Sequence, residues 1–233
     1  IEVWNIFSSA HITTIPKIVN GTITCMKFFV SKSKNFITYG TSMKQIVVLG
    51  ESLPGQFELV FVFDGYEKEI SCIDFDPVTE SIIAGSSGGE LALFPLDSNF
   101  TARMVKFTDE VEIVAMKLFE HNLFILSADQ IITVIILPML RIDSRAFGLS
   151  SNIPHIITAI DADKELVVTG DSNGYVRIWE IIDASFVTII PVNLVRCHEK
   201  EILSVMMIYS GRILVTSSTD NLVRLWDVSS MDL

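Results

Sequence analysis

The stretch of this sequence that most resembles a ligand site is GDSNG at residues 170–174. Glycine-rich loops can bind a phosphate through their backbone N–H groups when the loop opens a helix. Here the loop lies between two apolar, β-branched runs typical of strands, and no G-x-x-x-x-G-K-[ST] or G-x-G-x-x-G sequence occurs. We therefore interpret GDSNG as the turn of a β-hairpin and expect no cofactor and no small-molecule substrate.

Two pairs of carboxylates, Asp74/Asp76 and Asp161/Asp163, have the alternating spacing found in calcium loops. Neither pair continues into a loop that ends on a glutamate, so we interpret all four side chains as solvated turn residues. The H-E-x-x-H sequence of zinc proteases and the G-x-S-x-G sequence of serine hydrolases are also absent. The sequence therefore predicts no metal ligand and no catalytic residue, and we expect a protein that is not an enzyme.

Three cysteines, Cys25, Cys72 and Cys197, are far apart in the chain and odd in number. No C-x-x-C pair or Cys/His cluster accompanies them, which argues against a disulfide framework and against a zinc site. The pattern favours a reducing compartment, and we expect a cytoplasmic protein.

Composition limits the classes of partner. Hydrophobic residues make up 49% of the 233 residues and charged residues only 19%, with a net charge of −11. Because nucleic-acid affinity depends on neutralising phosphates, so acidic a chain is expected to bind no nucleic acid. The longest apolar run, IITVIILPML at residues 131–140, is too short to cross a bilayer, and we expect no membrane association.

The elements that must position these residues repeat along the chain. GDSNGYVRIWEI and STDNLVRLWDV align on their tryptophans, and the opening IEVWNI joins them. With the weaker copies between them, the Trp position of the repeat reads Trp4, Leu49, Phe94, Ile135, Trp179 and Trp226. Successive members are about 41 to 47 residues apart, close to the period of four-stranded β-propeller blades.

A second column has the same period. Five segments begin with an isoleucine and carry a small residue two positions later, where we expect the first strand of each blade. The segments start at Ile23, Ile70, Ile113, Ile156 and Ile202, and their small residues are Cys25, Cys72, Ala115, Thr158 and Ser204. First strands lie nearest the propeller axis, where neighbouring sheets crowd, so small side chains are expected there. Cys25 and Cys72 are thus interpreted as small fillers.

Each unit also contains a middle strand that ends on small or turn-forming residues, such as NFITYG, and a less regular outer strand. Pro16 and Pro191 fall in outer strands, as expected for a residue that donates no backbone hydrogen bond. The sequence therefore predicts an all-β chain, a β-propeller of four-stranded blades with about five blades and one leading strand. The predicted units are residues 1–21 (incomplete), 22–69, 70–110, 111–154, 155–200 and 201–233. Because IEVWNI reads as the third strand of a blade, we expect a fragment of a larger ring.

The last unit resembles the WD-repeat family of β-propellers, since LVRLWDV carries the Trp-Asp dipeptide as Trp226 and Asp227. The resemblance covers the whole chain, unevenly. In that family a buried network joins a His before the first strand, a Ser or Thr in the second strand, an Asp in the next turn and the Trp. The matching residues here are His198, Thr216, Asp220 and Trp226. The resemblance implies that these four are structural rather than a catalytic triad.

The other units keep only parts of this network, which we expect to be complete in one unit of five. The unit before the last keeps Thr169 and Trp179, with Asn173 at the Asp position, Asn152 at the His position and His155 out of register. In one further unit Asp129 stands at the Asp position and Ile135 at the Trp position. In another, Tyr66 follows Gly65 where the family usually has Gly-His, and Phe94 stands at the Trp position. Trp4 is the Trp position of the incomplete first unit.

Residues 153–181 and 196–228 more narrowly resemble the long WD-repeat proteins of ciliary and flagellar axonemes. The resemblance implies a non-enzymatic protein-interaction scaffold in a larger assembly, with microtubule-associated or other axonemal proteins of the cytoskeleton as partners. In the family, partners contact the face that carries the turns between second and third strands. Ser87, Ser172 and Thr219 are therefore the candidate partner-facing residues.

Two alternatives remain open. An adaptor that recruits substrates to a ubiquitin ligase, or to a vesicle coat, would share all of these features. A propeller enzyme such as a glycosidase would need paired carboxylates in the central channel, and the small and apolar residues of the first strands count against it.

Overall fold

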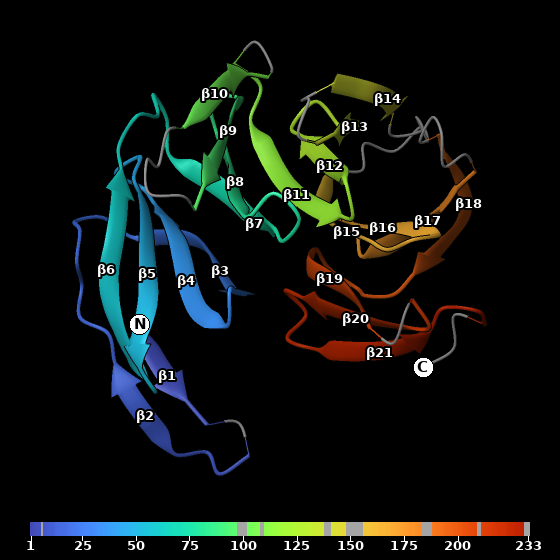
Figure 1. The fold of residues 1–233 in the computed structure, drawn as a ribbon. Coiled ribbons are helices and arrows are strands. Elements are labelled where there is room, and N and C mark those ends of the chain that lie inside the picture. The colour runs from blue at the N-terminus through green and yellow to red at the C-terminus, as the bar shows by residue number, and fades with distance from the viewer. Residues whose placement is uncertain are drawn as a thin grey trace. The chain divides into compact units, whose positions relative to one another are not determined.

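The computed structural model describes residues 1–5, 7–96, 102–107, 110–137, 141–147, 156–182, 188–208 and 211–230. All the regular elements within these ranges are β-strands, β1 to β21 (Figure 1), which confirms the predicted all-β class. The described residues contain no helix long and apolar enough to cross a membrane. The chain divides into two compact parts, Ile1–Glu110 and Val111–Leu233.

The N-terminal part contains a hairpin and two four-stranded antiparallel sheets. The hairpin pairs β1 (Glu2–Trp4) with β2 (His11–Thr14). The β3–β6 blade consists of β3 (Ile23–Ser31), β4 (Lys34–Thr41), β5 (Ile46–Leu53) and β6 (Gln56–Phe63). The β7–β10 blade consists of β7 (Ile70–Asp76), β8 (Ser81–Ser86), β9 (Glu90–Pro95) and β10 (Arg103–Lys106).

The C-terminal part contains three sheets. The β11–β14 blade consists of β11 (Ile113–Phe119), β12 (Asn122–Ser127), β13 (Ile131–Ile136) and β14 (Arg141–Phe147). The β15–β18 blade consists of β15 (Ile157–Ala162), β16 (Leu166–Asp171), β17 (Tyr175–Ile181) and β18 (Ile189–Arg196). The β19–β21 blade has three strands among the described residues: β19 (Ile202–Ile208), β20 (Ile213–Ser218) and β21 (Val223–Asp227).

Every blade has a β-bulge at the same place in its first strand. The register with the second strand skips one residue, and the small position follows the skip in each blade. The small position reads Cys25, Cys72, Ala115, Ala159 and Ser204. The expected column was therefore wrong by one residue in the β15–β18 blade. There the segment starts at Ile157 rather than Ile156, and Ala159 rather than Thr158 fills the small position, because the bulge falls at Thr158.

Glycines opposite the small position show how closely the first strands pack against neighbouring blades. Gly40 pairs with Cys25, and a Cβ atom at Gly40 would lie 2.6 Å from the side chain of Ile70 in the next blade. A Cβ atom at Gly170 would lie 2.5 Å from the side chain of Ile202. Contacts this short exclude a larger residue, so the crowding predicted from the small column is present.

The five turns between second and third strands share one geometry. In each, the last residue of the turn has a positive φ and donates its N–H to the carbonyl three residues earlier, a common three-residue hairpin loop. These residues are Lys44, Gly89, Gln130, Gly174 and Asn221. GDSNG is one of these turns, which confirms its interpretation as a hairpin.

The Trp position is also regular. Its members in the five blades are at most 7% exposed, and each faces a branched aliphatic residue on the second strand. Trp4 differs, since it is 52% exposed. The hairpin register nevertheless shifts between Val3 and Trp4, as it shifts before Leu49, Ile135 and Trp179 in the blades. This supports the assignment of β1 as a third strand.

Candidate functional site

The predicted network of the last blade is assembled in the structure. His198 Nε2 lies 2.7 Å from Thr216 Oγ1, and His198 Nδ1 lies 2.9 Å from Asp220 Oδ2. Trp226 Nε1 donates to Thr216 Oγ1 over 3.0 Å. Because the Asp220 carboxylate can only accept, His198 Nδ1 donates to it, and in the neutral imidazole Nε2 then accepts from the Thr216 hydroxyl. The hydrogen bonds therefore run in one direction, from Trp226 through Thr216 and His198 to Asp220.

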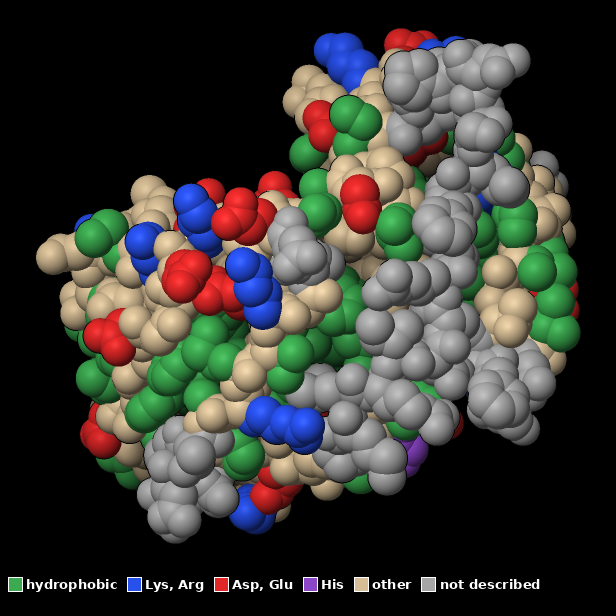
Figure 2. All heavy atoms as spheres, turned by 90° about the horizontal axis from the view of Figure 1, so that it is seen from above, with side chains coloured by type: hydrophobic (Ala, Val, Ile, Leu, Met, Phe, Trp, Pro, Cys, Tyr) green, Lys and Arg blue, Asp and Glu red, His purple; other side chains and the backbone are tan. Residues whose placement is uncertain are grey.

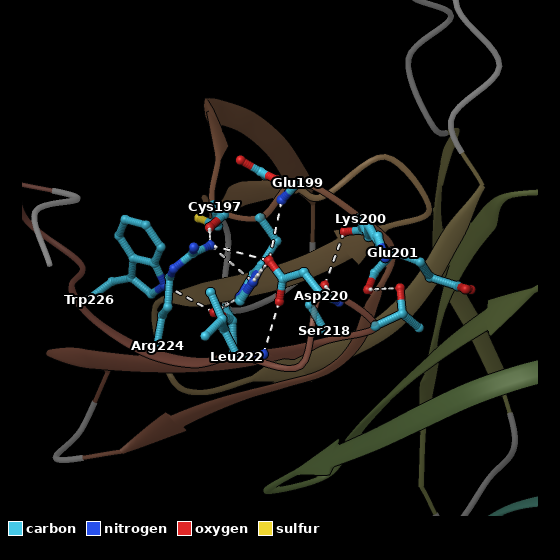
Figure 3. Close-up of polar contacts among 12 residues, drawn as sticks. Cys197, Glu199, Lys200, Glu201, Ser218, Asp220, Leu222, Arg224 and Trp226 are labelled. Atoms are coloured by element: carbon cyan, nitrogen blue, oxygen red, sulfur yellow. Dashed lines mark hydrogen bonds and ion pairs between the residues drawn. The ribbon is translucent and has the colours of Figure 1, made fainter.

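Asp220 is the charged end of this network (Figure 3). Its side chain is 7% exposed, and its carboxylate also accepts the backbone N–H groups of Leu222 at 3.0 Å and Glu199 at 3.4 Å. Arg224 donates to the carbonyl of Cys197 and lies 3.5 Å from Asp220. Burial opposes ionisation, but the hydrogen bonds from His198, Leu222 and Glu199 outweigh it and lower the pKa of Asp220 to about 2.

The order Thr, His, Asp is that of a hydrolase triad, yet this network cannot act as one. A nucleophile must reach a substrate, and Thr216 is 0% exposed while His198 is 2% exposed. The Thr216 oxygen is moreover occupied by the indole N–H of Trp226. The arrangement ties the loop before β19 to the hairpin between β20 and β21.

The β15–β18 blade keeps the Trp–Thr part of the network. Trp179 Nε1 donates to Thr169 Oγ1 over 3.0 Å, and both side chains are buried. Asn173 stands at the Asp position, and its backbone N–H donates to Asp171 Oδ1 at 2.8 Å. The expected His position, Asn152, and His155 lie outside the described residues.

The remaining partial members make local contacts. Asp129 accepts the Ser127 hydroxyl at 2.6 Å within its own turn, and Ile135 is 1% exposed at the Trp position. Trp4 donates to Glu2 at 3.2 Å and packs edge-on against His11, so it has its own partners in the hairpin.

The β7–β10 blade replaces the network with aromatic packing. Tyr66, at the His position, donates its hydroxyl to the carbonyl of Ala84 over 2.9 Å. Phe94, at the Trp position, lies with its ring centroid 4.7 Å from that of Phe63. A residue that the sequence reasoning missed, Glu90, is 9% exposed here and accepts hydrogen bonds from the loop before β7. The sequence carries a signal for this role of Glu90, because Gly88 stands at the Asp position and an acidic residue follows two positions later.

Three of the four paired carboxylates are buried, so their interpretation as solvated turn residues was wrong. Asp74 lies 2.6 Å from Lys27 on the preceding first strand, and Asp161 lies 2.7 Å from Lys117. Asp76 is 0% exposed, and its carboxylate accepts the N–H of Val78 and the hydroxyl of Thr79. Only Asp163 fits the expectation, as a partly exposed acceptor in a turn. Within the described residues, no group of three or more His, Cys, Asp and Glu could hold a metal ion.

The candidate partner-facing residues occupy equivalent places in their turns. The backbone N–H groups of Ser87, Ser172 and Thr219 each donate to the residue just before the first strand of their own blade. Ser87 and Ser172 are half-buried and Thr219 is exposed. The Ser172 hydroxyl accepts from Ile156, and the Thr219 hydroxyl donates to Glu201. Their contact with partners stays a prediction.

Comparison with known proteins identifies the repeat. The WD domain, G-beta repeat (WD40) family matches residues 57–94, 150–180 and 190–227. Each match ends at the Trp position or one residue after it, as in the alignment by tryptophans.

Two proteins illustrate the likeness. Eukaryotic translation initiation factor 3 subunit I of Culex quinquefasciatus is 25% identical over 192 residues, which cover 75% of this chain and 56% of that protein. The chain thus spans little more than half the length of this relative. The crystal structure of the Cps50 (Swd1) β-propeller domain of Myceliophteria thermophila superposes with a TM-score of 0.71 at 18% identity, over 90% of this chain and 66% of that one. The predicted β-propeller fold is therefore confirmed.

Proposed function

Since the chain belongs to the WD-repeat β-propeller family, we propose that it is a non-enzymatic protein-interaction scaffold within a larger assembly. The observation that carries the proposal is the division between its interior and its surface. The side chains of His198, Thr216, Asp220 and Trp226 form hydrogen bonds with one another inside the last blade. Outer strands meanwhile expose apolar side chains, as β18 does with Ile190, Val192 and Leu194 at 39%, 50% and 41%. Such exposed apolar groups favour protein contacts.

The distribution of charge agrees with a protein partner. On the face shown in Figure 2, described basic side chains lie among acidic ones and do not form a continuous patch, with apolar side chains between them. With a net charge of −11, the whole chain is poorly suited to nucleic acid. None of the three cysteines, all of which are described, is joined in a disulfide, which supports a place in the reducing cytoplasm.

Two assemblies are candidates. The resemblance of residues 153–181 and 196–228 to axonemal WD-repeat proteins favours a ciliary or flagellar axoneme. The match to a translation initiation factor 3 subunit favours a complex in translation initiation. The loops of a propeller serve either setting, because recognition resides in loops held by a rigid scaffold.

Fractionation of cells that carry the tagged full-length protein tests both levels of the proposal. A scaffold is expected to migrate in a stoichiometric complex after mild crosslinking. Retention with detergent-extracted axonemes would support the first assembly, and cosedimentation with translation initiation complexes the second. A protein that migrates as a monomer in both fractionations would overturn the scaffold proposal.

A further inference from the structure

We propose that Glu90 takes over in the β7–β10 blade the part that Asp220 plays in the β19–β21 blade, and that it thereby positions the turn that carries Ser87. The inference rests on the proposed function only in treating this turn as a contact surface.

The two turns are equivalent residue by residue. Gly89 has a φ of 79° and donates its N–H to Ser86, while Asn221 has a φ of 67° and donates to Ser218. The residue before each is therefore the Asp position, which holds Asp220 in one blade and Gly88 in the other. Gly88 has no side chain that could hold the neighbouring loop.

The Glu90 carboxylate reaches the backbone group that Asp220 holds in the last blade. Asp220 accepts the N–H of Glu199, the residue after the His position, at 3.4 Å. Both oxygens of Glu90 lie 3.2 Å from the N–H of Glu67, the residue after Tyr66. Glu90 lies two residues after the Asp position of its turn, and a glutamate side chain is long enough to reach the N–H of Glu67 from there.

The Glu90 carboxylate is also fixed to its own turn. The Ser86 hydroxyl donates to it over 2.9 Å and accepts the N–H groups of Gly88 and Glu90 in return. Glu90 is 9% exposed, and its carboxylate, hydrogen-bonded on both sides, links the turn at Ser87 to the loop before β7.

The aromatic replacement explains why the acid could move. In the last blade the carboxylate must stand where it can accept from the imidazole Nδ1 of His198. In the β7–β10 blade, Tyr66 is satisfied by the carbonyl of Ala84, so its ring needs no carboxylate. Only the backbone N–H of Glu67 remains to be held, and a residue outside the Asp position can do that.

Amide hydrogen exchange in the full-length protein tests this assignment. In Glu90→Leu, exchange at Glu67 is expected to accelerate about tenfold or more, the usual effect of losing a hydrogen bond to a charged acceptor. Glu90→Gln keeps an acceptor oxygen, so a smaller acceleration is expected, and it serves as the readout if the leucine variant does not fold. Glu69→Gln, in the same loop with an exposed side chain, is the matched control and should leave the rate unchanged.

A double substitution tests whether Glu90 performs the role that an aspartate at the Asp position performs in the last blade. In Gly88→Asp/Glu90→Leu, the aspartate is expected to return exchange at Glu67 toward the wild-type rate. The backbone at Gly88 has no positive φ, and a Cβ atom there would lie 2.7 Å from Cγ and 3.2 Å from Cβ of Lys68, so the exposed Lys68 side chain has to shift to admit the aspartate. Unchanged exchange in both Glu90 variants, or acceleration without rescue, would overturn the proposal. Neither readout needs a partner, so failure here is distinct from failure of the scaffold function.

Discussion

Thr216 is a residue whose one hydroxyl serves two buried partners, the indole N–H of Trp226 and the imidazole of His198. Within the part of the chain that the structure describes, Thr169 serves only Trp179, and the Thr38 hydroxyl is buried without a hydrogen-bond partner. Valine has nearly the same shape as threonine, so Thr→Val at these three positions removes little besides the hydroxyl.

We expect the three substitutions to fall in a fixed order of stability. An orphaned buried group costs about 1–3 kcal/mol, so Thr216→Val should lower the free energy of unfolding by about 2–4 kcal/mol and Thr169→Val by about half as much. Thr38→Val should raise it by about 1 kcal/mol, since it removes a buried polar group that has no partner. Urea unfolding of the full-length variants measures the order, and equal losses at all three positions would contradict it.

Asp220 gives the stability of the last blade a defined dependence on pH. The folded-state pKa of about 2 lies below the ordinary value of 3.8, so the unfolded chain takes up a proton first as the pH falls. The contribution of Asp220 is therefore fully present above about pH 4 and is lost between there and pH 2. We expect Asp220→Asn to be less stable than wild type at neutral pH, with the difference shrinking over this window. Thermal unfolding at several pH values measures it, and parallel curves would contradict the assignment.

At the scale of elements, neighbouring first strands are joined by ion pairs at one repeated position. Lys27 with Asp74, and Lys117 with Asp161, connect successive blades, and Asp161 also accepts the N–H of Met207 on β19 at 2.6 Å. The two aspartates are 4% exposed, and the facing lysine contributes to the charge compensation of each.

Loss of one lysine should therefore cost more than loss of a surface pair. We expect Lys117→Met to destabilise the protein by about 1–3 kcal/mol, because it leaves the buried Asp161 carboxylate without its counter-charge and one of its hydrogen-bond donors. Lys32, which is 73% exposed beside Glu80, is the matched control, and Lys32→Met should cost less than about 1 kcal/mol. Denaturant midpoints decide between them, and an equal cost would show that Asp161 is solvated after all.

These pairs also mark the limit of what the sequence could predict. Period, strand order and turn type follow from local patterns, because each blade repeats the same spacing of apolar, small and turn residues. The partner of Asp161 is 44 residues away on another sheet, and no local spacing indicates it. The register at Thr158 was missed because adjacent isoleucines fit the column equally well, and only the bulge decides between them. Glu90 was missed because its role arises only where the residue at the His position, here Tyr66, needs no carboxylate partner.

At the scale of the whole molecule, the cysteines report on the integrity of both parts of the chain. Cys72 lies in the N-terminal part and Cys197 in the C-terminal part, and each is buried. Burial raises the pKa of both thiols from 9.0 to about 12, and burial likewise raises the pKa of the half-buried Cys25. None of the three is expected to be reactive while its part of the chain is folded, because the thiolate is the reacting form.

Thiol labelling at pH 8 should therefore be slow in the native protein. With a pKa of about 12, roughly one thiol in ten thousand is ionised, against about one in ten for an ordinary cysteine, so the thiolate population falls about a thousandfold. Mass spectrometry of tryptic peptides after a timed pulse of iodoacetamide resolves the three sites, with urea-unfolded protein as the reference. We expect Cys72 and Cys197 to be labelled at least a hundred times more slowly than in the unfolded chain, and Cys25 at an intermediate rate. Native labelling of Cys72 or Cys197 at the unfolded rate would show that the blade carrying it opens freely, which is incompatible with a rigid scaffold.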